Sequence, residues 1–282
     1  MWTDRLRVGL ALTLAVFATA AVAGDAPLQT KQAGVLRVAV YTNYAPFADG
    51  EQGIDVDIGK ALAEKLGLKA EVRGYPDADS IDGDLRNIIW KGHHLWREQI
   101  ADVMMHVPVD PAVIKKNDKV TIFGPYFRER LVVARNRARI PTLPTMQVFA
   151  TEKIGVEVES LEDRYLVAHY GGTLRPNVVH FATLNAATEA LVKGEVAAVM
   201  GRQTLIEAGL GSAAGNFEIS TAPTPGIQTS GWELGMAVKA DNPELAAALG
   251  KAITELLKEG FVERAFTKRG LSYRAPVGVG TP

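Results

Sequence analysis

The sequence predicts an α/β fold in which strands alternate with helices and pair in parallel. The run 34–40 is apolar and rich in valine, as expected of a strand. A helical pattern follows, because Ile58, Leu62 and Leu66 recur at spacings of four, and the run 68–75 again has strand character. Strand, helix and strand in this order form the basic unit of a parallel sheet.

The composition is that of a globular protein without an electrostatic preference for nucleic acid. Of its 282 residues, 47% are hydrophobic and 22% are charged, and 31 Lys and Arg residues balance 32 Asp and Glu residues. This balance gives no reason to expect nucleic acid or an anionic membrane surface as a partner. The chain contains no cysteine, which excludes disulfides, thiolate metal ligands, cysteine nucleophiles and a lipid anchor on cysteine.

Residues 1–23 have the pattern of a secretory signal peptide. Arg5 and Arg7 precede an apolar run of 13 residues at 8–20, and Ala21-Val-Ala23 is a small-x-small cleavage signal. The run is too short to span a bilayer, which takes about 20 residues. We therefore expect a soluble protein of the periplasm without a membrane anchor.

Two aspartates are expected to begin helices as N-caps, because a carboxylate can accept from the free N–H groups of the first turn. Asp57 would begin a helix that ends at Gly67, and Asp84 would begin one that ends at Gly92. The apolar run 101–107 is predicted to be a buried strand. It should stop at a proline, which offers no N–H to a sheet.

Candidate cleft residues follow from the strand ends, since ligands in open α/β sheets lie at the carboxyl ends of strands. The loop after the first strand contains Tyr44 and Phe47, which we expect to form a stacking wall for a ligand or to pack on the surface. The end of the strand predicted at 101–107 contributes further cleft candidates, namely His106, Val107, Pro108 and Asp110.

The remaining chain continues the alternation of strands and helices. Asn242 followed by proline is expected to cap a long helix that ends at Gly260. From Arg274 on, proline and glycine predict a disordered tail at 274–282. Strands are expected at 153–158, 178–181, 196–200, 217–221 and 232–238, and further helices at 161–170, 184–193, 203–208 and 261–269.

The segment Gly53-Ile-Asp-Val-Asp-Ile58, with Leu62 and Leu66 after it, resembles the signature of bacterial extracellular solute-binding proteins of family 3. The strand 36–40 and the downstream Tyr44-Ala-Pro-Phe47 resemble the same family, and the resemblance covers most of 34–270. It implies the type II periplasmic-binding-protein fold, with two lobes, two crossover strands, and a ligand cleft that closes by hinge motion.

The resemblance also implies where the lobes begin and end. Lobe 1 would comprise residues 34–130 and 231–273, and lobe 2 residues 131–230. The segment 122–130 resembles the family's Pro-Tyr segment before the first crossover, which places Tyr126, Arg128 and Arg130 at the hinge. Trp232, at the start of the returning crossover, is a further cleft candidate.

Two departures from the family concern ligand recognition. Members that bind amino acids carry an arginine after a strand of the first lobe and an aspartate after the last strand of the second. The matching segment 105–114 has no arginine, and the residue that follows 198–201 is Arg202. We therefore expect no binding of α-amino acids in the family's manner. Arg202 favours an acidic ligand or an acidic partner surface, or is a solvated residue.

Three blocks, 84–94, 101–110 and 123–130, resemble the methanol oxidation J-type branch of the family. The resemblance implies a periplasmic accessory protein that assists activation or maturation of a PQQ-dependent (quinoprotein) methanol or alcohol dehydrogenase through its cleft. That dehydrogenase, its c-type cytochrome and a small-molecule ligand are the candidate partners. The alternatives are the receptor of an ABC importer for a small non-amino-acid metabolite and, third, a dehydratase-like enzyme.

Catalysis has little support in the sequence. No nucleophile motif, metal-ligand spacing or phosphate-binding glycine loop is present, so we expect neither an enzyme nor a cofactor. His93 and His94 are adjacent, and neighbouring residues of a helix point about 100° apart, which disfavours joint chelation of a metal.

Overall fold

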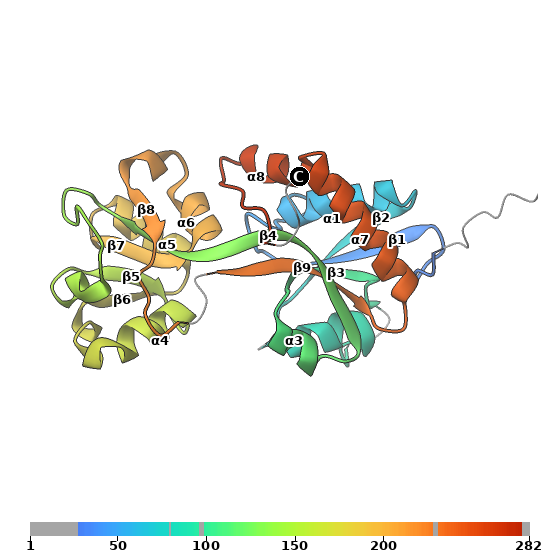
Figure 1. The fold of residues 1–282 in the computed structure, drawn as a ribbon, viewed down its shortest axis with the longest axis horizontal. Coiled ribbons are helices and arrows are strands. Elements are labelled where there is room, and N and C mark those ends of the chain that lie inside the picture. Colours follow the sequence, from blue (N-terminus) through green and yellow to red (C-terminus); the bar gives the residue numbers. More distant parts are fainter. Residues whose placement is uncertain (1–27, 79, 96–98, 228–230, 278–282) are drawn as a thin grey trace, which may run out of the picture.

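Two α/β lobes joined by two long strands make up this chain (Figure 1). The structure is a computed structural model that describes residues 28–78, 80–95, 99–227 and 231–277. We call residues 28–130 and 231–277 the first lobe and residues 131–227 the second lobe. The expected signal peptide and residues 278–282 of the expected tail lie outside the described residues.

The first lobe is a five-stranded sheet with helices on both faces. Its strand order is β2-β1-β3-β9-β4, with β1 (Val35–Tyr41) parallel to β2 (Lys69–Tyr75) and to β3 (Val103–Pro108). Alternate residues of β1 face opposite cores, as the two-residue period of a strand requires. One core lies under α1 (Ile54–Lys65), α7 (Pro243–Lys258) and α8 (Phe261–Thr267), and the other under α2 (Ile81–Leu85) and the π-helical turn Arg86–Trp90.

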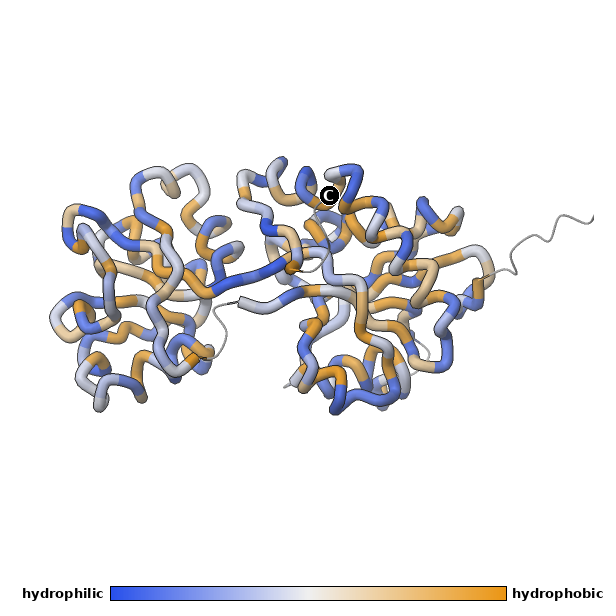
Figure 2. The backbone as a smooth tube through the Cα atoms, in the orientation of Figure 1, coloured by the Kyte–Doolittle hydropathy of each residue, from blue (hydrophilic) through white to orange (hydrophobic). Residues whose placement is uncertain are grey.

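The two long strands carry the chain between the lobes. β4 (Val120–Arg135) pairs with β9 (Gly231–Lys239) through Arg130, and from Leu131 on it pairs with β7 (Ala198–Arg202) instead. The ladder thus changes partner within one peptide unit. Figure 2 shows that the part of β4 between the lobes is hydrophilic, whereas apolar residues gather in the sheet of each lobe.

The second lobe has strand order β8-β4-β7-β5-β6 and again two cores. One core includes residues of α4 (Leu161–Ala168), and the other lies under α5 (Leu184–Val192) and α6 (Gln203–Leu210). The remaining elements are β5 (Ile154–Glu157), β6 (Val178–Phe181), β8 (Glu218–Thr221), α3 (Pro111–Lys116) and short 3₁₀ turns at 146–150, 170–172, 175–177 and 211–216. None of the described helices is both long and apolar enough to cross a membrane.

Both aspartate N-cap predictions are wrong. α1 begins three residues before Asp57, after Gly53, where φ is 138° and a Cβ would lie 2.1 Å from the carbonyl oxygen of Phe47. Asp57 instead pairs with Lys268 and Arg269 of the C-terminal segment, each at 2.7 Å. The start of α1 is therefore set by tertiary backbone contacts and not by a side-chain cap.

The second aspartate, Asp84, lies inside α2, whose N-cap is Ser80. Its buried carboxylate accepts from the Tyr41 hydroxyl at 2.8 Å and from the Ala78 N–H at 2.6 Å. The N-cap expected at Asn242 is confirmed, because its side-chain oxygen accepts from the Leu245 N–H at 3.2 Å.

Residues 274–277, which the sequence places in a disordered tail, contact both crossover strands. The Arg128 N–H donates to the Arg274 carbonyl at 3.1 Å, and the Val277 N–H donates to the Glu233 carboxylate at 2.5 Å. The C-terminal segment is therefore part of the hinge region of the first lobe.

Candidate functional site

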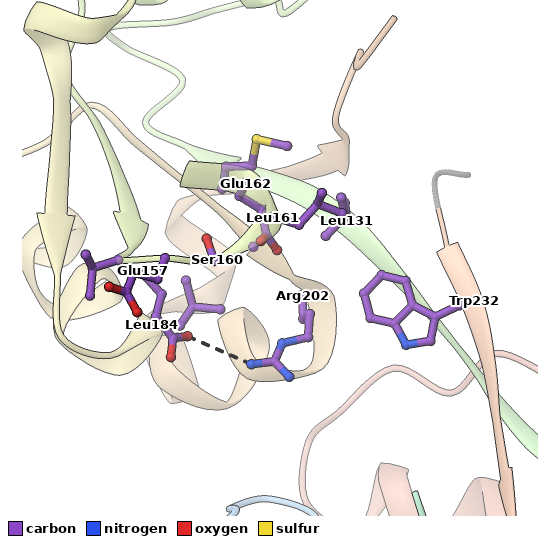
Figure 3. Close-up of a pocket in the computed structure, with 12 residues that line it drawn as sticks. Leu131, Glu157, Ser160, Leu161, Glu162, Leu184, Arg202 and Trp232 are labelled. Carbon is purple, nitrogen blue, oxygen red and sulfur yellow. Dashed lines mark ion pairs between the residues drawn. The ribbon is translucent and has the colours of Figure 1, made fainter. Parts of the chain in front are cut away.

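A pocket of about 330 Å³ lies on the second lobe, where β5 and β7 end and α4 begins (Figure 3). The crossover strands contribute Leu131 and Trp232 to its wall. This is the carboxyl edge of the second sheet, the place where ligands bind in open α/β folds. The other lining residues are Glu157, Val158, Glu159, Ser160, Leu161, Glu162, Leu184, Met200, Gly201 and Arg202.

Carboxylates outnumber cations in this pocket. Glu157, Glu159 and Glu162 line it together with a single arginine, Arg202. Glu162 is only 6% exposed, and burial raises the pKa of its carboxyl. Arg202 Nη2 lies 3.8 Å from Glu157 Oε2, so part of the charge is already paired. The remaining acidic groups favour a ligand that carries positive charge.

Arg202 also links the two lobes. Its guanidinium donates to the hydroxyl of Tyr44 in the first lobe, and its Cζ lies 5.6 Å from the centre of the Tyr44 ring. Burial raises the pKa of Tyr44 to about 12, against the opposing effect of the Arg202 charge. The phenol therefore stays protonated at neutral pH and accepts from Arg202 through its oxygen.

Tyr44 belongs to an aromatic cluster on the first lobe. It stacks on Phe47 at 5.7 Å between ring centres, and the His106 ring lies 4.3 Å from Phe47 and 5.0 Å from Tyr44. Tyr41 packs edge-on against Tyr44 at 5.8 Å. Both residues expected to form a stacking wall thus lie in one cluster, although Phe47 itself is buried at 1% exposure.

A buried polar network holds His106 in place. Asp55 is 1% exposed, and its carboxylate contacts His106 Nδ1 at 3.0 Å and accepts from the Tyr126 hydroxyl at 2.6 Å. The same hydroxyl accepts from the His106 N–H at 3.0 Å. His106 lies at a bulge between β3 and β9 and has φ 63°, a conformation that costs energy for a residue other than glycine. The Tyr126 hydroxyl thus gives the His106 N–H a hydrogen-bond acceptor at the bulge, where the regular pairing of β3 with β9 is interrupted.

Sequence reasoning did not single out Asp55 for this network. Asp55 lies between the buried residues Ile54 and Val56 at the start of α1. A charged residue among buried apolar ones was the feature of the sequence that could have indicated a buried polar network. Tyr126, expected at the hinge, lies on β4 and is buried in the core of the first lobe.

Three of the expected cleft residues serve the first lobe's own structure. Val107 is fully buried in the core beneath α2 and the π-helical turn, Pro108 pairs with Leu234 in the sheet, and Asp110 caps α3 by accepting from two N–H groups at 2.8 and 3.1 Å. None of them lines the pocket. The reason is that all three residues pack or bond within the first lobe, whereas this pocket lies on the second lobe.

The hinge arginines have separate partners. Arg128 pairs with Glu233 at 3.4 Å, and Arg130 donates to the Gln203 side-chain oxygen and to the Thr221 hydroxyl at 3.2 Å. Glu129 is 2% exposed, and its carboxylate accepts from the N–H groups of Arg130 at 2.9 Å and Thr204 at 3.4 Å. Burial raises the pKa of Glu129.

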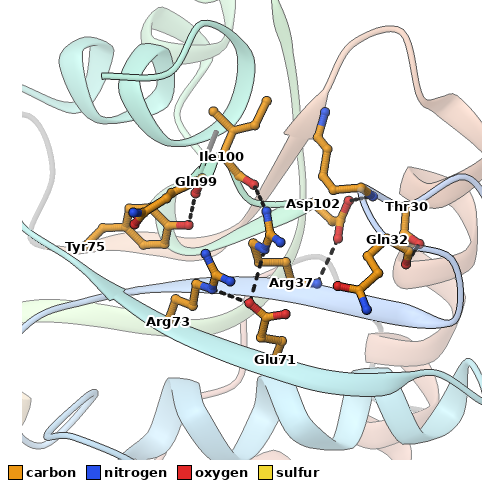
Figure 4. Close-up of polar contacts among 10 residues, drawn as sticks. Thr30, Gln32, Arg37, Glu71, Arg73, Tyr75, Gln99, Ile100 and Asp102 are labelled. Carbon is orange, nitrogen blue, oxygen red and sulfur yellow. Dashed lines mark hydrogen bonds and ion pairs between the residues drawn. The ribbon is translucent and has the colours of Figure 1, made fainter. Parts of the chain in front are cut away.

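A second polar cluster lies near the start of β1, and its role is structural (Figure 4). Asp102 accepts from the N–H groups of Lys31 at 2.7 Å and Arg37 at 2.8 Å. Arg37 in turn donates to the Ile100 carbonyl at 3.1 Å and pairs with Glu71 at 3.3 Å. The cluster fastens the N-terminal segment to the sheet. Among the described residues, no group of three or more His, Cys, Asp or Glu could hold a metal ion.

No family model matches the chain. In sequence, the chain is similar to the probable ABC transporter arginine-binding protein ArtJ of Chlamydia trachomatis serovar D. The two are 23% identical over 243 residues, which cover 83% of this chain and 85% of that protein.

In structure, the chain is similar to an ancestral cationic amino acid solute-binding protein, AncCDT-1, with a TM-score of 0.64, 20% identity, and coverage of 83% of this chain and 95% of that one. It is also similar to an amino acid ABC transporter substrate-binding protein from Streptococcus pneumoniae bound to L-arginine, with a TM-score of 0.56, 17% identity, and coverage of 86% and 96%. The fold is therefore the two-lobed periplasmic-binding-protein fold of type II. None of these three proteins is named for a quinoprotein dehydrogenase.

Proposed function

We propose that this chain is the substrate-binding receptor of an ABC importer and binds a small solute between its two lobes in the periplasm. The observation that carries the proposal is the pocket at the carboxyl edge of the second sheet, from which Arg202 reaches Tyr44 of the first lobe. A solute in this position would contact groups from both lobes. The similarity to solute-binding proteins of ABC transporters supports this function.

The pocket's chemistry favours a solute with an amine or guanidinium group. Glu157, Glu159 and Glu162 supply negative charge, and the Trp232 indole offers an aromatic face for a cation. Arg202, the only cation among the described residues of the pocket wall, already neighbours Glu157. A ligand carboxylate would have to compete for it, so we expect a cationic metabolite other than an α-amino acid.

Matched pairs of probes test this expectation by isothermal titration of the chain from Gly24 on. Arginine and agmatine differ only by the carboxylate, as do ornithine and putrescine. We expect the decarboxylated member of each pair to bind more tightly. Glu157→Gln should weaken binding about tenfold, since a hydrogen bond to a charged group contributes about 1.5–3 kcal/mol.

The matched control is Glu152→Gln, because Glu152 pairs with Arg139 and does not line the pocket. This variant should bind like the wild type. Absence of heat with every probe, together with an unchanged radius of gyration in small-angle scattering, would refute a receptor for cationic solutes.

A second candidate is the accessory role for a quinoprotein methanol or alcohol dehydrogenase. The absence of an arginine from the segment 105–114 favours it, because that segment departs from the amino-acid-binding pattern. The test is a pull-down with the chain as bait in a periplasmic extract of alcohol-grown cells. Enrichment of a quinoprotein dehydrogenase, lost in Arg202→Gln, supports the accessory role, whereas a co-purifying small molecule without dehydrogenase supports the receptor.

A further inference from the structure

A second cavity, of about 650 Å³, lies at the junction of the lobes and shares no lining residue with the ligand pocket. The first lobe contributes Arg130 of β4 and the segment that follows α8. The second lobe contributes residues of α6 and β8. The lining residues are Arg130, Arg137, Gln203, Glu207, Phe217, Glu218, Ile219, Ser272, Tyr273 and Arg274.

The carboxylates of this junction cavity are already engaged. Glu218 pairs with Arg137. Glu207 accepts from the Gln203 amide through one oxygen and from the Ser272 N–H, at 2.7 Å, through the other. The second of these bonds connects α6 of the second lobe to the C-terminal segment of the first.

Two of the three arginines lack such a partner. Arg130 donates only to uncharged oxygens, those of Gln203 and Thr221, which hold its guanidinium in a set orientation. Within residues 28–78, 80–95, 99–227 and 231–277, neither Arg130 nor Arg274 forms an ion pair with a carboxylate. Burial, and then the positive charge of Arg274, lower the pKa of Arg130 against the opposing effect of the Glu207 and Glu129 charges, so the two guanidinium groups lie close enough to repel each other.

The backbone holds these two arginines near each other. The Arg128 N–H donates to the Arg274 carbonyl at 3.1 Å, and Arg130 lies two residues further along the same strand. The Tyr273 hydroxyl donates to the Tyr126 carbonyl at 3.1 Å, which fastens the C-terminal segment to β4 from a second point. Such an arrangement suits a small anion with two or more acidic oxygens, because guanidinium groups bind these oxygens in a fork.

We propose that the junction cavity is a second binding site, for a small oxyanion of the phosphate or carboxylate type that bridges Arg130 and Arg274. The anion contacts the crossover strand and the C-terminal segment at the point where the second lobe meets them. Gln203 and Thr221 of the second lobe orient the Arg130 guanidinium, so the site is complete only while these contacts between the lobes are made, which couples anion binding to lobe opening.

Inorganic phosphate and citrate serve as probes, titrated into the chain from Gly24 on by calorimetry at constant ionic strength set with NaCl. We expect saturable binding of at least one probe. Arg130→Gln and Arg274→Gln should each weaken it about tenfold or more, as expected for loss of a charge-assisted hydrogen bond. Arg274 is exposed, so its replacement leaves the packing intact even if Arg130→Gln disturbs the hinge.

Two further variants distinguish a specific anion site from a general effect of the chain's positive charge on anion binding. Arg139→Gln also removes one positive charge, but Arg139 pairs with Glu152 outside the cavity, so this variant should bind like the wild type. Arg274→Glu places a carboxylate beside Arg130, and should abolish anion binding. No saturable binding of either probe, or binding that neither Arg130→Gln nor Arg274→Gln weakens, overturns the proposal. Agmatine titrations of the same variants report on the ligand pocket separately.

Discussion

Removing the Tyr126 hydroxyl should destabilise the first lobe strongly, because this group connects two otherwise distant segments. It donates to Asp55 at 2.6 Å in the interior and accepts from the His106 N–H at 3.0 Å at a partly buried position. Burial, and then the negative charge of Asp55, raise the pKa of Tyr126 well above its usual value, so the hydroxyl keeps its proton. Tyr126→Phe leaves the ring in the core and removes only these two bonds.

The cost can be worked out from the two groups left unpaired. A hydrogen bond to a charged carboxylate contributes about 1.5–3 kcal/mol, and one between neutral groups about 1 kcal/mol. The variant should therefore lose about 2.5–4 kcal/mol of unfolding free energy. At about 2–4 °C per kcal/mol for a chain of this size, the melting temperature should fall by roughly 5–15 °C.

Urea denaturation followed by circular dichroism, with calorimetry for the melting temperature, measures this loss. The matched control is Tyr165→Phe, since Tyr165 is also buried but its hydroxyl bonds no carboxylate: it donates to the Pro225 carbonyl at 3.3 Å and neighbours the Tyr170 hydroxyl. The control should lose about 0.5–1 kcal/mol. If Tyr126→Phe costs no more than the control, the network does not hold the bulge at His106, and the reasoning is wrong.

Three further predictions concern the hinge, the pocket and a helix cap. Burial raises the pKa of Glu129 in the folded chain. The stability that the protonated Glu129 carboxyl contributes is therefore complete below the ordinary glutamate pKa of about 4.3 and is lost as the pH rises through the raised pKa of the folded state. Glu129→Gln should flatten this decline of the unfolding free energy with pH, measured by urea denaturation at several pH values. Arg202→Gln removes the contact with Tyr44, so the ligand-free radius of gyration in small-angle scattering should increase; an unchanged radius would contradict the inter-lobe link. Asn242→Ala should lower the unfolding free energy from urea denaturation by about 1 kcal/mol with an unchanged m-value, because the Leu245 N–H loses its hydrogen-bond acceptor.

The alternation of strands and helices could be predicted from the sequence because it depends on local periodicity. The strand predicted at 178–181 has the same bounds as β6, and the helix expected after Asn242 is α7. The capping predictions at Asp57 and Asp84 failed because each carboxylate has a stronger partner far away in the sequence. A capping motif identifies a side chain that can accept an N–H, but it does not identify which N–H or cation reaches it in the fold.

The candidate site could be predicted only in part. Arg202 and Trp232 line the pocket, and both were expected there from the resemblance to the solute-binding family, Arg202 at the place of the family's aspartate and Trp232 at the returning crossover. The acidic wall could not be predicted, because Glu157 precedes Arg202 by dozens of residues and no local pattern distinguishes it from a solvated glutamate. The contact between Asp55 and His106 likewise spans 51 positions and depends on the bulge in β3.

The pocket and the hinge are connected through consecutive residues at the start of α6. Arg202 reaches into the pocket, Gln203 accepts from Arg130 of β4, and the Thr204 N–H donates to the buried carboxylate of Glu129. A rotation of β4 at its change of partner therefore shifts the backbone that positions Arg202. Because coupling between two sites is reciprocal, a solute that repositions Arg202 must also act on the hinge through Glu129. We therefore expect the three consecutive residues 202–204 to link the hinge to the pocket. Thr204→Pro, which removes the N–H bound by Glu129, should weaken solute binding in isothermal titration without touching the pocket wall; unchanged affinity would contradict this link.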